Sequence, residues 1–66
     1  MTRIRELRKS KGLSMTELSH EIRTNSSMLS WLELGKLSGS PSIRAALSKF
    51  YGVAEDRLFN SNGLAI

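Results

Sequence analysis

The chain has 66 residues and no cysteine, so neither a disulfide nor a cysteine-bound zinc ion can reinforce its small core. A chain of this length can bury the core of one domain at most. Ten lysine and arginine residues against six acidic residues give a net charge of +4, which fits a polyanionic partner, nucleic acid first and a membrane surface second, and equally well a merely soluble basic surface. No apolar run approaches the ~20 residues that span a bilayer, so a cytoplasmic protein with no membrane contact is expected.

A short helix is predicted at the start of the chain. Ile4 and Leu7 lie one helical turn apart, and Thr2 is placed to cap the helix. Gly12 ends it, because glycine takes the left-handed conformation that follows many helices at no steric cost. The pattern therefore predicts a helix over residues 3–11.

A second helix begins with a capping box. Ser14 is followed three residues later by Glu17, a spacing at which each side chain binds the backbone N–H of the other residue. The inner face of this helix follows at helical spacing and consists of Met15, Leu18 and Ile22.

A third helix follows after about three residues. Asn25 is its predicted cap, Leu29 and Leu32 are its inner face, and Gly35 closes it. Ser19 supplies a small side chain where the second and third helices approach each other. Two short helices that pack at a fixed angle form a helix-turn-helix, and the second of these helices fits a major groove about 12 Å wide.

Two more helices complete the prediction. Ser40 or Ser42 caps a fourth helix that starts near Pro41 and ends at Gly52. Its apolar stripe consists of Ile43, Ala46, Leu47 and Phe50. A last helix is expected over 53–59 with Leu58 inward, followed by a turn or disordered stretch over 60–63. The sequence thus predicts an all-α, compact five-helix fold, with a domain over 1–60 and a short tail over 61–66.

The chain from Ile4 to Phe59 resembles the Cro/CI-type (XRE, lambda-repressor-like) helix-turn-helix family of bacteria and phages. The resemblance is carried by Leu13, Ser14, Glu17, Leu18, Ser19, Ile22, Asn25, Leu29, Ser30, Leu32, Glu33, Gly35, Lys36, Pro41, Ser42, Leu47, Tyr51, Gly52, Val53, Leu58 and Phe59. It implies a transcriptional regulator of the repressor type, which binds a two-fold site on double-stranded DNA as a homodimer and needs no cofactor or metal.

The resemblance also implies roles for single residues. Base edges are expected to meet Ser26, Ser27 and Trp31. Asn25, at the cap position of the same helix, is also expected to contact DNA. The positions expected to touch the DNA backbone are Ser14, Met15, Ser30, Lys36 and Arg44. Arg8 and Glu33 match an ion pair that ties the first helix to the third, a structural role. The expected dimer or partner surface is the end of the chain, namely Phe59, Leu64 and Ile66.

Two residues of the helix-turn-helix depart from the family pattern. Met15 stands where glutamine is usual, and a thioether cannot donate the corresponding hydrogen bond to a phosphate. Arg23 stands where a turn glycine is usual, and arginine costs on the order of 1 kcal/mol if the site keeps a positive φ.

The outward side of the third helix is unusually apolar. Met28, Trp31 and Leu34 are expected to remain partly exposed there, where readers of base edges usually carry arginine, glutamine, asparagine or lysine. Trp31 has three interpretations: a residue lining the core, a DNA contact, or an anchor for a partner protein. A protein-interaction module on the same fold, such as a modulator of a repressor, an antirepressor or an antitoxin, is therefore the alternative function.

Other polar residues receive plainer interpretations. His20 has no second potential ligand one turn away and is read as a surface residue without metal. No serine lies beside an activated base, so a nucleophilic enzyme is not expected. Four cations are read as a solvated helix face rather than as phosphate contacts, namely Arg3, Arg5, Lys9 and Lys11.

Overall fold

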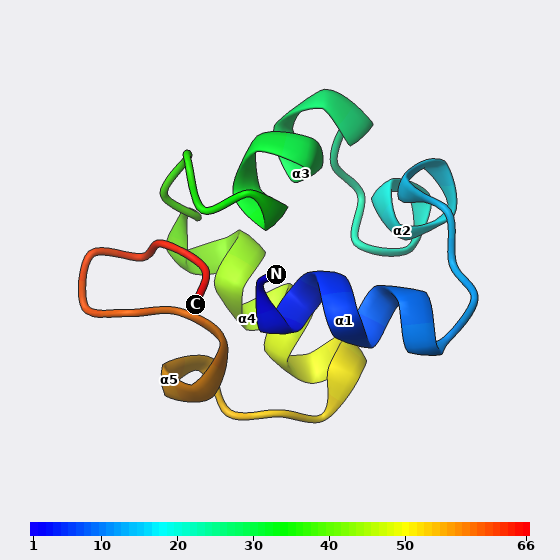
Figure 1. The fold of residues 1–66 in the computed structure, drawn as a ribbon. Helices are drawn as coiled ribbons and strands as arrows, with labels where there is room; N and C mark the ends of the chain where they lie inside the picture. Colours follow the sequence, from blue (N-terminus) through cyan, green and yellow to red (C-terminus); the bar gives the residue numbers. More distant parts are fainter.

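A computed structural model describes the whole chain, residues 1–66, as five α-helices joined by short loops (Figure 1). The helices are α1 (Arg3–Ser10), α2 (Met15–Glu21), α3 (Ser26–Glu33), α4 (Pro41–Tyr51) and α5 (Glu55–Leu58). The only β-type pairing is one isolated bridge between Phe59 and Ala65. The predicted all-α fold with five helices is confirmed. None of these helices combines the length and the apolar character that crossing a membrane requires.

Every helix contributes to one buried core. Its members are Ile4, Leu18, Leu29, Leu32, Leu47, Leu58, Phe59 and Ala65. Five of these leucines, one on each of α2, α4 and α5 and two on α3, have no exposed surface. Burial of one such side chain contributes about 1.5–3 kcal/mol, so even this small set stabilises the fold substantially. The other apolar residues expected to face inward are only partly buried against this core, namely Leu7, Met15, Ile22, Ile43 and Phe50.

The predicted caps of α2 and α3 are present. Ser14 Oγ accepts a hydrogen bond from the Glu17 N–H at 3.0 Å, and Glu17 Oε1 accepts one from the Ser14 N–H at 2.9 Å. These bonds stabilise the ionised carboxylate, so the pKa of Glu17 lies below its ordinary value. Asn25 Oδ1 accepts from the Met28 N–H at 2.7 Å. Both helix starts are therefore fixed by residues within the segment itself.

Thr2 does not cap α1 as expected. Its side chain makes no capping hydrogen bond. Instead, Thr2 Oγ1 donates to the backbone carbonyl of Glu33 at 2.6 Å. This bond satisfies one of the carbonyls left free at the end of α3, and it ties that end to the start of α1.

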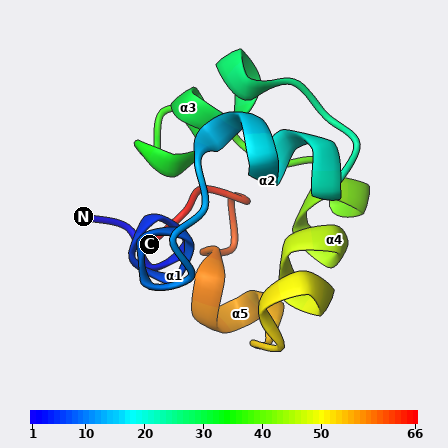
Figure 2. The same cartoon turned by 90° about the vertical axis from the view of Figure 1, so that its right-hand side faces the viewer.

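The end of the chain packs into the molecule as an ordered segment. A turn over 60–63 brings Leu64 back to Asn60, whose N–H donates to the Leu64 carbonyl at 2.8 Å. The Ile66 N–H then donates to the Leu58 carbonyl at 3.0 Å, and the Ile66 carbonyl accepts from the Arg3 N–H at 2.7 Å. Figure 2 shows these last residues, drawn in red, running beside α1 and α5. Residues 61–66, expected as a tail, thus contribute to the same packed unit as the five helices.

Helix α5 is shorter than the predicted helix over 53–59. Ala54, the residue before it, has no side chain that could cap the free N–H groups. Phe59 ends it in an extended conformation, because Phe59 pairs with Ala65 of the returning tail. The extended pairing replaces the last predicted turn of the helix.

Candidate DNA-binding surface

Helices α2 and α3 pack directly against each other, and Figure 1 shows α3 at the top of the view with α2 to its right. Leu18 of α2 is buried together with Leu29 and Leu32 of α3, all without exposed surface. Ser19 is also buried, and its hydroxyl donates to the Thr16 carbonyl at 2.7 Å, so no polar group is left unpaired at this contact. The small, satisfied side chain permits the close approach that fixes the angle between the two helices.

The turn between α2 and α3 contains a left-handed residue that is not glycine. Arg23 has a φ of 58°, the only positive φ outside glycine in the chain. The Thr24 N–H donates to the Ser19 carbonyl at 2.9 Å, which closes the turn. Because Arg23 keeps a positive φ, it carries the backbone strain of about 1 kcal/mol that is expected for a residue other than glycine at this site. Its side chain is exposed and free to meet an anion.

Helix α1 also contacts α3 and fixes its position through an ion pair. Arg8 Nε lies 2.9 Å from Glu33 Oε2, and Arg8 Nη1 donates to the Leu13 carbonyl at 2.8 Å. Glu33 is buried, with its second carboxylate oxygen unpartnered. Nearby, Tyr51 has a buried hydroxyl without a partner, and burial, followed by the charge of Glu33, raises the pKa of Tyr51 to about 12. A charged cluster beneath α3 therefore joins it to the rest of the fold.

The side of α3 opposite the core is open. Successive helical residues are about 100° apart, so burial of Leu29, Leu32 and Glu33 directs Ser27, Ser30, Trp31 and Leu34 outward. Trp31 is 55% exposed, which excludes the interpretation of Trp31 as a residue lining the core. These side chains border a shallow hollow between α3 and the start of α2, lined by Met15, Thr16, Ser26, Ser27, Ser30, Trp31 and Leu34. We call this surface the α3 face.

The α3 face collects most of the predicted DNA-contacting residues. It unites Met15, Ser26, Ser27, Ser30 and Trp31 from two helices. Thr16 was missed by sequence reasoning, although its place in the first turn of α2, next to Met15, is a signal that could have found it.

Four predicted residues lie outside the lining of this hollow, namely Ser14, Asn25, Lys36 and Arg44. Ser14 and Lys36 are exposed at neighbouring positions, just before α2 and just after α3. Arg44 is half-buried on α4, where its Nε lies 3.8 Å from Glu55 Oε1, and both residues border a different hollow. Arg44 does not line the hollow of the α3 face, and its expected contact with a phosphate stays a prediction.

Two residues at the start of α3 do not line the hollow of the α3 face. Met28 is half-buried on the flank of the helix, where its sulfur accepts a weak hydrogen bond from Thr24 Oγ1 at 3.9 Å. It remains partly exposed, as expected, one helical turn before Trp31. Asn25 has its side-chain oxygen engaged by the Met28 N–H, so only its amide nitrogen is free.

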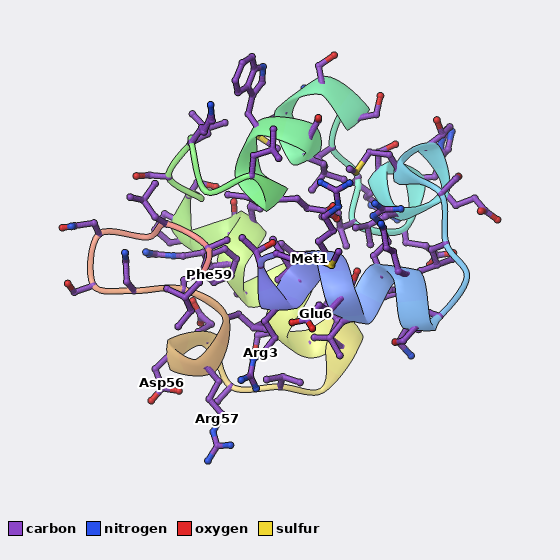
Figure 3. All side chains as sticks on the ribbon, in the orientation of Figure 1. Met1, Arg3, Glu6, Asp56, Arg57 and Phe59 are labelled. Atoms are coloured by element: carbon purple, nitrogen blue, oxygen red, sulfur yellow. The ribbon has the colours of Figure 1, made fainter.

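The residues expected at a dimer or partner surface are mostly inside the molecule. Phe59 is 3% exposed and belongs to the core, so its side chain offers no surface to a partner. Figure 3 shows its neighbours Asp56 and Arg57 projecting away from α5, while Phe59 lies within the body. Leu64 is half-buried, and Ile66 alone remains exposed, at 52%. Phe59 lies near the end of the chain but is buried, because the tail returns and Ala65 pairs with it.

The fold and the α3 face together define a helix-turn-helix domain, with two helices at a fixed angle and an open outward side on the second. Residues 2–58 match the model of a family described as a helix-turn-helix domain. The chain belongs to this family, which is of the Cro/CI/XRE type. Comparison with curated protein sequences and with solved structures gave no match. The chain brings together no group of three potential metal-ligating side chains.

Proposed function

We propose that this chain is a sequence-specific, DNA-binding transcription regulator of the repressor type, acting in the cytoplasm without catalysis. It places α3 in the major groove of a two-fold site, with one chain on each half-site. The observation that carries the proposal is the open α3 face on a helix fixed by α1 and α2. Membership of a helix-turn-helix family supports it, as does the net charge of +4.

Two of the ten cations flank α3 in the sequence, and none lies on the helix. Arg23 precedes the helix and Lys36 follows it, and both are exposed. Such positions suit contacts to the phosphates on the two sides of a groove, which orient a protein without reading sequence. Base reading is then left to the α3 face.

The homodimer rests on a second exposed patch. Ile66 and Met1 line a hollow beside the start of α1, and both are exposed. Since Phe59 is buried, we propose Ile66 and Met1 as the self-association surface. Sedimentation of the chain with and without a selected duplex tests this: two chains per duplex support the homodimer, and one chain on a single half-site contradicts it.

Binding is tested by selecting duplexes from a random pool and titrating the best one by fluorescence anisotropy. The proposal expects a clear preference over random DNA and a steep loss of affinity with salt, because neutralised phosphates release counterions. The variant Ser27→Glu places a negative charge on the α3 face, where it opposes phosphates and should lower affinity at least about tenfold. Ser61→Glu is the matched control, since Ser61 is an exposed serine in the turn over 60–63. Absence of both preference and salt dependence would refute the proposal.

The second candidate is a protein-interaction module on the same fold. It is favoured by one observation: no lysine or arginine occurs between Arg23 and Lys36, whereas Trp31 and Leu34 are 55% and 48% exposed. Replacing Trp31 with alanine separates the two candidates. A regulator loses DNA affinity or site preference, whereas an interaction module loses a defined protein complex and never binds duplex DNA tightly.

A further inference from the structure

The α3 face lacks the side chains that most proteins use to recognise bases. Guanine is usually read by the two donors of arginine or lysine, and adenine by the amide of asparagine or glutamine, which uses its oxygen and nitrogen together. No arginine or lysine lies on α3, and the chain contains no glutamine. Asn25 is the one carboxamide near the face, and its oxygen already accepts the Met28 N–H at 2.7 Å. Paired hydrogen bonds to a base edge are therefore not available here.

The chemistry that remains is apolar surface with hydroxyl groups around it. Trp31 and Leu34 are the large exposed apolar side chains of the face, and Met15 borders the same hollow while packing on the core. Ser26, Ser27 and Ser30 supply single hydroxyls, which donate or accept toward any base. The face thus combines three apolar side chains and four hydroxyl groups in one hollow, and the hydrogen bonds of these hydroxyls discriminate little between bases.

Among the four bases, only thymine presents an apolar group in the major groove. Its methyl group projects beyond the hydrogen-bonding edge and is contacted by apolar side chains in protein–DNA complexes. A methyl group is also small enough to enter a shallow hollow between two helices. The remaining edges of the groove are polar, and an apolar surface pressed on them would leave their donors and acceptors unpaired.

We infer that the α3 face selects its DNA site through thymine methyl groups, with Trp31 as the main specificity-determining residue. The inference rests on the proposed function and deepens it, because it names the base feature that is read. The preferred half-site contains at least one thymine whose methyl group enters the hollow beside Trp31. The serines satisfy the neighbouring polar edges.

The test removes the methyl group and nothing else. In a duplex selected with the full chain, each thymine is replaced in turn by deoxyuridine, which keeps every hydrogen-bonding group of the base. Titration by fluorescence anisotropy should show a loss of affinity of about fourfold for each methyl group that is buried in the complex. Positions outside the contacted half-sites should show no change.

Protein variants assign the effect to the α3 face. Trp31→Ala should bind the parent duplex more weakly. It should also bind the thymine duplex and the deoxyuridine duplex equally well at the position where the parent protein distinguishes them. A double-mutant cycle over the protein and DNA changes measures this coupling between Trp31 and the methyl group. Leu37→Ala is the matched control, because Leu37 is an exposed apolar residue that does not line the hollow. It should retain the full discrimination. Circular dichroism of both variants establishes that they are folded.

The outcomes separate the inference from the proposed function. If a selected duplex binds with sequence preference but no replacement changes the affinity more than about twofold, methyl reading is wrong and DNA binding stands. If Trp31→Ala keeps the discrimination, the assignment to the α3 face is wrong. If no duplex is preferred and Trp31 instead holds a defined protein partner, both the inference and the proposed function fail.

Discussion

Arg8 Nε lies 2.9 Å from Glu33 Oε2, and this ion pair joins α1 to the end of α3 across 25 residues of sequence. The two side chains are 12% and 1% exposed. The orientation of α3 thus depends on a charged contact on the side opposite the α3 face. The Thr2 hydroxyl strengthens the same junction by donating to the Glu33 backbone carbonyl.

Replacement of Arg8 by methionine should destabilise the fold strongly. The Glu33 carboxylate would remain buried without its partner, and an uncompensated buried charge costs about 3 kcal/mol or more. Urea denaturation should show a lower midpoint with an unchanged slope. The double variant Arg8→Met with Glu33→Leu removes both charges and should recover most of the loss. A single variant as stable as the parent would show that the ion pair does not hold α3.

Replacement of Arg23 by glycine should stabilise the fold relative to replacement by alanine. Both variants lose the same side chain, but only glycine adopts a φ of 58° without steric cost. The expected difference in the free energy of unfolding is about 1 kcal/mol in favour of glycine. Thermal and urea unfolding of the two variants measure it directly. Equal stabilities would mean that the turn relaxes to a negative φ when the arginine is absent.

The local features of the fold could be predicted from the sequence because the residues that determine them are neighbours. Ser14 and Glu17 are three positions apart, and their capping box forms as the spacing predicts. Asn25 caps α3 in the same way, and Gly52 takes the left-handed conformation at the end of α4. In each case the physical cause lies within one helical turn.

The errors concern contacts between distant segments. Thr2 looks like a helix cap in sequence, but its hydroxyl is used by Glu33, which is 31 positions away. Phe59 looks exposed because nothing local shows that Ala65 will return to cover it. Such outcomes depend on tertiary packing, which a hydrophobic pattern does not encode.

Tyr51 should give the fold a distinct alkaline pH dependence. Its pKa is raised from an ordinary value of 10.0 to about 12, chiefly because burial disfavours the phenolate and also because Glu33 repels it. Below pH 10 the phenol is protonated in both states, so its contribution to stability is complete. As the pH rises from 10 to 12, the unfolded chain releases a proton that the folded chain keeps, and the free energy of unfolding falls.

The chain has a single tyrosine, so its titration can be followed by tyrosinate absorbance without interference from other phenols. Urea unfolding at several alkaline pH values measures the stability, and Tyr51→Phe is the control. The phenylalanine variant lacks the ionising group and should lose less stability over this pH range. It also removes a buried hydroxyl that has no partner, so its stability at neutral pH should equal or exceed that of the parent. Ionisation of Tyr51 at the ordinary pKa would contradict its placement.

Gly63 should be intolerant of a methyl group because the tail packs closely there. It has a φ of 78°, and an added Cβ would lie 2.9 Å from Arg44 Nη1 and 3.2 Å from the Gly39 carbonyl oxygen. The Gly39 N–H donates to the Gly63 carbonyl at 2.9 Å, so the two backbones cannot separate without losing this bond. Gly63→Ala should therefore lower the free energy of unfolding by about 2–3 kcal/mol, from backbone strain and from displacement of the tail.

Gly12→Ala is the matched control for this prediction. Gly12 has a φ of 66°, close to that of Gly63, but an added Cβ there meets nothing within 4 Å. It should lose only the backbone contribution, about 1 kcal/mol. The difference between the two variants in urea denaturation thus isolates the close packing of the tail from the cost of a positive φ. Equal losses would mean that residues 60–66 move aside freely, and the tail would then contribute little to holding Phe59 in the core.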